Sequence, residues 1–197
     1  MMRIPVWLIV LAVILLLIVI LVLVIIKKVE RFSRSIFGTR SLTQGILKQK
    51  EELARTPKSV AGMTRIYEPQ LMKDFPEFNW KEFRQKAEQM LVLYLAAISK
   101  GQEQLIGGGS LALRQQLLTR ISENKRQQIT EQYQDVVIHN TEITRYERKQ
   151  GTCVLTLQSA VGHIHYKEKN KLLVEGDRTL PVQTRYNTQL MYVQDAN

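Results

Sequence analysis

The segment Asn79–Gly101, NWKEFRQKAEQMLVLYLAAISKG, carries the strongest folding signal in this chain of 197 residues. Asn79 is a good N-cap residue, and Glu82 follows three residues later at the spacing of a capping box. Gly101 is the residue type that most readily adopts the left-handed conformation at the end of a helix. These signals predict one long helix between Asn79 and Gly101.

Apolar residues line one side of this predicted helix. Phe78 and Phe83 stand at the two positions of a hydrophobic staple, which fixes how the chain enters the helix. Apolar positions then recur with a period near 3.6 residues: Phe83, Ala87, Met90, Leu91, Tyr94, Ala97 and Ile98. Such a stripe is typical of a helix face that packs into a core, and it favours core packing over a cofactor site.

A second helix is predicted after the glycine run Gly107–Gly109. This run lacks the preceding strand and the following Lys-Ser/Thr pair of a phosphate-binding loop, so it indicates a flexible turn. Ser110 is a suitable cap for the next helix, and we expect helicity to continue towards Ile129 and Tyr133. The expected buried face comprises Leu113, Leu117, Leu118 and Ile121.

The pattern changes from helices to strands after Gln134. Alternating apolar and polar residues predict strands at Val136–Arg148, Thr152–Tyr166, Leu172–Val174 and Val182–Val193. Turn residues separate them at 149–151 and 176–177, and Gly162 suggests a bulge. The expected core faces are Cys153, Leu155, Leu157 and Val161 in the second strand and Val182, Tyr186, Leu190 and Tyr192 in the last. Helices followed by an antiparallel meander predict an α+β fold, with helices packed on one face of a curved sheet.

The residues before the long helix show a different pattern. Residues 41–56 predict a charged helix that ends before Pro57, because a residue preceding proline avoids the helical region. Residues 59–78 contain Pro69 and Pro76 and predict a loop-rich entry to the domain.

The N-terminal segment Ile4–Ile26 reads IPVWLIVLAVILLLIVILVLVII and contains neither a charged residue nor a glycine. As a helix it would be about 35 Å long, enough to cross a hydrocarbon core of about 30 Å with some tilt. Pro5 falls in the first turn and Trp7 near one interface, where these residues are common. A cleaved signal peptide has a shorter apolar region followed by small residues, whereas lysines follow here. The segment therefore predicts a transmembrane helix.

Basic residues after the predicted span indicate its orientation. Residues 27–58 contain nine Lys and Arg against three Glu, whereas Arg3 is the one basic side chain before the span. The side richer in basic residues stays cytoplasmic, so we expect a single-pass protein of the cell membrane with a cytoplasmic C-terminal domain. The expected organisation is an anchor at residues 1–26, a basic juxtamembrane linker at 27–58 and an α+β domain at 59–197.

The linker is also a candidate site for anionic lipid, which attracts nearby basic side chains by about 1 kcal/mol each. The candidate residues are Lys27, Lys28, Arg31, Arg34, Arg40, Lys48 and Lys50. Apolar residues of the same stretch, including Ile46 and Leu47, are suited to the membrane interface. The alternative is a solvated spacer whose charges only set the topology. Residues 59–197 contain 18 basic and 15 acidic residues and no aromatic–basic RNA motif, which argues against nucleic acid as a partner.

No catalytic or metal-binding motif is prominent in the sequence. Cys153 is the one cysteine, which excludes an internal disulfide and a cysteine zinc cluster. His163 and His165 would point the same way from a strand, but His139 is the only other histidine and nothing in the sequence places it nearby. An isomerase-type site needs a buried carboxylate and an oxyanion donor. The available residues are Asp135, Glu142, Tyr146, Tyr186 and Tyr192, so we expect no cofactor, no metal and no enzymatic activity.

Three segments resemble the Tim-forty-four-like domain family, which is named for a subunit of the mitochondrial protein-import motor. They are FPEFNWKEFRQKAEQMLVLYLAAISKG (Phe75–Gly101), VVIHNTEITRYERKQGTCVLTLQSA (Val136–Ala160) and TRYNTQLMYVQD (Thr184–Asp195). The resemblance covers roughly residues 60–195 and implies the cystatin-like α+β roll shared with nuclear transport factor two and ketosteroid isomerase. Bacterial members are similar in joining a membrane anchor and a basic stretch to this domain. Some carry a zinc ribbon, whose Cys-x-x-Cys pairs are absent from this sequence.

The resemblance implies an adaptor or scaffold in protein transport. We therefore expect a membrane-anchored, non-enzymatic protein that contacts anionic lipid and binds a protein partner through its roll domain. Two alternatives stay open. One is a small-molecule-binding or enzymatic roll that uses the cone-shaped pocket between sheet and helices. The other is a secretion-assembly factor on the outer side of the membrane, which requires the opposite topology.

Overall fold

The computed structural model describes residues 15–16, 18–28, 42–149 and 152–193. Residues 15–16 and 18–28 are helical. Within the described ranges, no helix is both long enough and apolar enough to cross a bilayer. More than half of the predicted span Ile4–Ile26 lies outside these ranges, so the transmembrane helix stays a prediction. The chain forms two compact units, Met1–Leu53 and Ala54–Asn197, and the second contains the sheet.

Helices precede strands in the order that the sequence predicts. The helical elements are α2 Leu42–Arg55, α3 Thr64–Asp74, α4 Trp80–Lys100, the short 3-10 helix η1 Glu103–Ile106 and α5 Leu111–Gln127. The strands are β1 Ile129–Lys149, β2 Thr152–Lys169, β3 Leu172–Gly176 and β4 Val182–Val193. The expected α+β class, with helices against a four-stranded antiparallel sheet, is confirmed.

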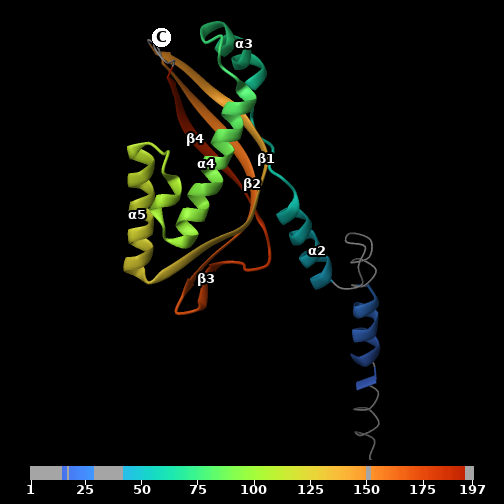
Figure 1. Ribbon diagram of the computed structural model, residues 1–197. Coiled ribbons are helices and arrows are strands. Elements are labelled where there is room, and N and C mark those ends of the chain that lie inside the picture. The colour runs from blue at the N-terminus through green and yellow to red at the C-terminus, as the bar shows by residue number, and fades with distance from the viewer. Residues whose placement is uncertain (1–14, 17, 29–41, 150–151, 194–197) are drawn as a thin grey trace, which may run out of the picture. The chain divides into compact units, whose positions relative to one another are not determined.

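β2 is the central strand of the sheet. It pairs antiparallel with β1 from one end to the other, so that Ile129 lies opposite Lys169 and Lys149 lies opposite Thr152. On its other side, β2 pairs first with β4 and then with β3. The register of the β1–β2 ladder shifts at three places along β1, and such bulges bend a sheet. Both long strands curve accordingly (Figure 1).

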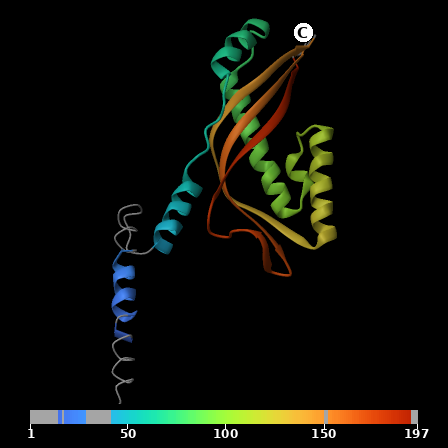
Figure 2. The ribbon, with the colours of Figure 1, turned by 180° about the vertical axis from the view of Figure 1, so that it is seen from behind.

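The core lies between the sheet and the helices that cross one of its faces. In both ribbon views α4 crosses this face and α5 lies beside α4 (Figures 1 and 2). The predicted core face of β2 has no solvent exposure at Cys153, Leu155, Leu157 and Val161. These residues belong to clusters that include Leu71 and Phe75 from the α3 region and Leu91 and Leu95 from α4. A further cluster joins α4, η1 and α5.

The long helix predicted from the opening segment is confirmed as α4. The Oδ1 of Asn79 accepts a hydrogen bond from the N–H of Glu82 at 3.2 Å, and Gly101 ends the helix with a φ of 63°. The rings of Phe78 and Phe83 lie 5.2 Å apart between centroids, as expected of a staple. Every residue of the predicted stripe is buried or half-buried.

The loop-rich entry predicted at residues 59–78 is wrong in its centre, where α3 forms with Pro69 inside it. The apolar side chains of Leu71 and Phe75 are buried in the core. Because packing of an apolar face supplies most of the stability of a helix in a protein, it outweighs the local signal of the proline here.

The second predicted helix ends earlier than expected. Gln128 adopts a left-handed φ of 58°, and its N–H bonds to the carbonyls of Asn124 and Lys125, which ends α5. β1 therefore begins at Ile129 rather than at Val136. Helices that end in a left-handed residue usually have glycine there, so a glutamine at this position did not indicate the end of the helix in the sequence.

Three smaller expectations are also wrong. Leu118 is exposed, because it lies about 100° around the helix from the buried Leu117. Val182 is exposed at the first position of β4. The bulge expected at Gly162 belongs to the facing strand, where the register shifts and Asp135 has a φ of 50°.

Candidate functional site

The residues predicted to contact lipid belong in part to the described chain. Three lie outside the described residues: Arg31, Arg34 and Arg40. Four are described and exposed: Lys27, Lys28, Lys48 and Lys50. The helix predicted at residues 41–56 is confirmed as α2, so Lys48 and Lys50 stand on a regular helix.

α2 is amphipathic. Ile46 and Leu53 are seven residues apart and therefore share one side of the helix, with Lys50 between them. Ile46, Leu47 and Leu53 are each more than half exposed. Exposed apolar side chains beside lysines are typical of a helix that lies in the headgroup region of a membrane.

A buried polar cluster joins α5 to the sheet and centres on Glu131 of β1. The side chain of Glu131 has no solvent exposure. Its Oε1 accepts hydrogen bonds from Arg120 Nη2 at 2.9 Å and from the Tyr133 hydroxyl and His165 Nε2 at 3.0 Å each. Its Oε2 accepts from Arg120 Nε and Asn124 Nδ2, both at 2.9 Å.

Local geometry brings the partners of Glu131 together. Arg120 and Asn124 are four residues apart, so they share one face of α5. Glu131 and Tyr133 are two residues apart, so they share one face of β1. The reversal of the chain at Gln128 then returns β1 towards the helix that precedes it.

The cluster holds Glu131 as a carboxylate. Burial alone would raise the pKa of Glu131, but hydrogen bonds from His165, Arg120 and Asn124 hold it well below its usual range. Because an ionised carboxylate only accepts, the Nε2 of His165 carries a proton. Five donor atoms contact this carboxylate, which has only about four lone pairs, so its capacity to accept hydrogen bonds is filled. A general base needs a raised pKa and an open face, and Glu131 offers neither.

His163 lies beside this cluster and is 2% exposed. Its Nδ1 has no hydrogen-bond partner among the described residues, and its Nε2 lies 3.4 Å from the Tyr186 hydroxyl. The rings of Tyr133 and His165 are further neighbours. Burial, followed by the influence of His165, lowers the pKa of His163 to about 4. His163 is therefore neutral at pH 7.

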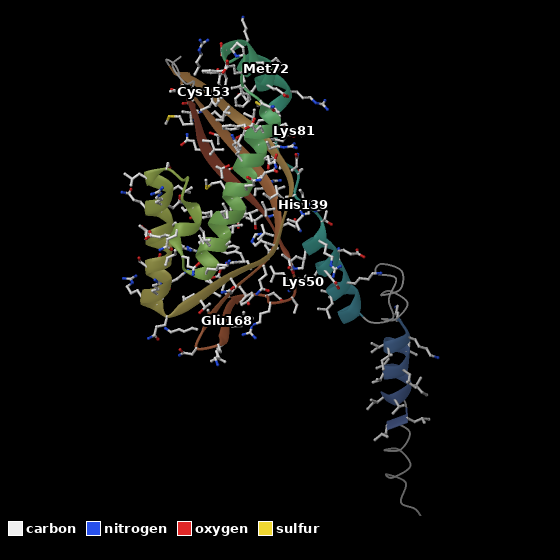
Figure 3. All side chains as sticks on the ribbon, viewed as in Figure 1. Lys50, Met72, Lys81, His139, Cys153 and Glu168 are labelled. Carbon is white, nitrogen blue, oxygen red and sulfur yellow. The ribbon has the colours of Figure 1, made fainter. Side chains whose placement is uncertain are left out.

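The three histidines do not come together as metal ligands. The Nε2 of His165 bonds to Glu131, and the ring of His165 stacks on Tyr133 at 4.5 Å between centroids. His139 is exposed on β1 (Figure 3). Within the described ranges, no three side chains of His, Cys, Asp or Glu gather closely enough to hold a metal ion.

The five residues considered for an isomerase-type site are dispersed over the sheet. Asp135 is exposed and Glu142 is half-buried. Tyr146 donates to a carboxylate of α3 at 2.6 Å, and Tyr192 packs among phenylalanine rings. Of the five, Tyr186 is the one that contacts the buried cluster, through a histidine ring.

A shallow, open groove runs between α4 and β1 and has a volume of about 550 Å³. Its lining residues are Gln85, Glu88, Gln89, Val92, Leu93, Val136 and Ile138. Val92 and Leu93 are exposed. An open apolar surface with amide side chains along it suits a protein segment, whereas small-molecule sites enclose most of their ligand.

Sequence reasoning missed the Glu131 cluster, because helicity was expected to continue towards Ile129 and Tyr133, whereas β1 begins at Ile129. The available signal was the alternation of Ile129, Glu131 and Tyr133. In a strand, that alternation puts the acid on the face of an apolar and an aromatic residue.

Neither a protein-family model nor a curated protein matches this sequence. The resemblance to the Tim-forty-four-like domain family therefore stays a prediction.

Proposed function

We propose that this protein is a membrane-anchored, non-enzymatic adaptor that holds a protein partner at the cytoplasmic surface of the cell membrane. Residues 4–26 are the anchor, residues 27–58 contact anionic lipid, and the folded unit binds the partner. We also propose that this unit is a cystatin-like roll of the Tim-forty-four-like kind and acts in protein transport. The order of elements and the curvature of the sheet support this finer assignment.

The observation that carries the proposal is the amphipathic α2 within the basic linker. It exposes Ile46, Leu47 and Leu53 beside Lys48 and Lys50. An apolar face favours the boundary between headgroups and acyl chains, and lysines add electrostatic attraction to anionic lipid. Two lysines at about 1 kcal/mol each correspond to about 30-fold in affinity.

The burial and complete hydrogen bonding of Glu131 support a non-enzymatic role. Its carboxylate is the fully buried acidic group of the described chain, and internal donors occupy both oxygens. A reaction that used it as a base would first have to break these bonds in a site without solvent exposure. The groove of α4 and β1 is instead accessible, so we place the protein partner at Val92 and Leu93.

Vesicle co-sedimentation tests the lipid contact. Residues 27–197 are mixed with neutral and with anionic liposomes at low and at high salt. The test variant is Lys48→Gln/Lys50→Gln, and the control is Lys81→Gln/Lys125→Gln, which removes the same charge from exposed positions of α4 and α5. Binding that requires anionic lipid, fades with salt and weakens about 30-fold only in the test variant supports the proposal. Equal binding of both variants rejects it.

Site-specific crosslinking tests the partner. A photoreactive residue at Leu93 is expected to capture a defined protein in cells, whereas the same residue at the exposed Leu111 of α5 is not. Equal labelling at both positions would show that Leu93 marks no specific interface.

A further inference from the structure

The hairpin of β2 and β3 exposes three consecutive apolar side chains. Leu172 is 71% exposed, Leu173 is 47% exposed and Val174 is 55% exposed. Alternate residues of a strand point to opposite faces, so neither face of β3 is covered. Proteins usually keep short edge strands polar to prevent unwanted association, and an exposed apolar run therefore indicates a contact surface.

This hairpin is well formed. Asn170 and Lys171 have φ values of 53° and 65°, as the two central residues of a type I′ turn require. An ion pair between Lys167 and Glu175 joins its two strands, and a second joins Glu168 of β2 to Arg178 just after β3, each at 2.7 Å. Leu172, Leu173 and Val174 are therefore held in the solvent by this hairpin, whose register shifts once, between Lys167 and Glu168.

Basic side chains flank the apolar run. The ion pairs above occupy the carboxylates of Glu168 and Glu175, whereas Lys169 and Lys171 are exposed and form no ion pair within the described ranges. The tip thus combines apolar and cationic groups. That combination is complementary to a bilayer with anionic headgroups, where lysines meet phosphates and aliphatic side chains reach the acyl boundary.

We propose that the tip, residues 169–174, inserts into the headgroup region of an anionic membrane and gives the folded unit a second attachment. This inference rests on the proposed membrane anchoring. Its location supports it, because the carbonyl of Ala54, where the chain enters the unit, accepts a hydrogen bond at 2.9 Å from Gln183. Gln183 is the second residue of β4, and β4 follows β3 after a short loop. The first residue of the folded unit therefore lies beside the strand that comes directly after the hairpin.

A second copy of the chain is the less fitting occupant. A five-residue strand with three apolar side chains offers far less than the about 800 Å² that each partner of a stable protein complex buries. A membrane surface imposes no such minimum, because the anchor already holds the unit beside the bilayer.

Lipid quenching of a site-specific probe tests the proposal on the full chain in proteoliposomes. Leu173→Cys carries an environment-sensitive dye, and Met72→Cys of α3 is the control. Met72 is also exposed, and Figure 3 shows it at the opposite end of this unit from Glu168 of the hairpin. Cys153 is fully buried, so labelling is directed to the introduced cysteines.

We expect a blue shift of the dye and quenching by spin-labelled lipid at position 173 when phosphatidylserine is present, and neither effect at position 72. Both effects should weaken in phosphatidylcholine alone and in a Lys169→Gln/Lys171→Gln background. Equal signals at the two positions overturn the proposal, as does crosslinking between two chains at position 173 without lipid quenching. Alkaline extraction of the same vesicles distinguishes the proposed anchor from the proposed hairpin contact. A chain that is extracted refutes the anchor. A chain that is retained but shows no quenching at position 173 refutes only the hairpin contact.

Discussion

We expect the folded unit to lose stability as the pH falls from about 6.5 to about 4, because His163 must then bind a proton in a buried site. An ordinary histidine has a pKa near 6.5, and burial lowers that of His163 to about 4. Between these values the unfolded chain binds more protons than the folded one, so stability is full above pH 6.5 and declines below it. A difference of about 2.5 pH units corresponds to about 3 kcal/mol.

Urea unfolding of the full chain in mild detergent measures this loss through the fluorescence of Trp80, in a background where Trp7 is replaced by phenylalanine. The test variant His163→Gln removes the titrating group, and the control His139→Gln removes an exposed histidine. Glu131 affects the free energy of unfolding only at the lower end of this pH range. Its pKa is depressed in the folded state, so its stabilisation is lost below the usual carboxyl pKa of about 4.3.

The wild type and His139→Gln should therefore lose about 3 kcal/mol between pH 7 and pH 4, and His163→Gln should show a much flatter profile. Parallel profiles for all three proteins would refute the reasoning, because the acid sensitivity would then arise elsewhere. A wild type with constant stability across this range would refute it as well, since the buried imidazole would have to accept a proton without cost.

Three further changes test the packing. Arg120→Ala leaves the buried carboxylate of Glu131 without its bidentate partner, and urea titration should show a loss of about 3 kcal/mol, near the lower limit for a buried pair because the arginine is partly exposed. Gly176→Ala places a Cβ against the carbonyl oxygen of His165 at a φ of 83°, so trypsin should cut the β2–β3 hairpin faster than in the wild type. Leu95→Ala empties a site that is 1% exposed and should lower the thermal midpoint, with a cost of about 2–5 kcal/mol.

The elements that sequence predicted well have local signals. The cap at Asn79 and the stop at Gly101 act within one turn of the helix, so α4 follows from its own residues. β4 likewise has the predicted bounds, because alternation within a strand needs no knowledge of its neighbour. The class α+β then follows from the order of the elements alone.

The errors share a dependence on distant contacts. Pro69 is tolerated in α3 because the apolar side chains of the α3 region are buried in the core of the unit. The Glu131 cluster forms because Gln128 reverses the chain and β2 supplies His165, and no window of the sequence contains all of these residues. A buried acid cannot be distinguished from a solvated one until the fold places its donors around it.

The complete pairing of the buried Glu131 bears on how this protein acts. Carboxyl groups with a raised pKa are common starting points of catalysis, whereas the buried Glu131 is charged and fully paired. Exposed apolar side chains lie, among other places, on α2, on the β3 hairpin and in the groove of α4 and β1. If the first two contact lipid, the folded unit is attached at two points and loses rotational freedom. A groove held in a fixed orientation meets a membrane-bound partner at a higher effective concentration than one on a free tether, and this is the physical advantage that an adaptor gains from a second attachment.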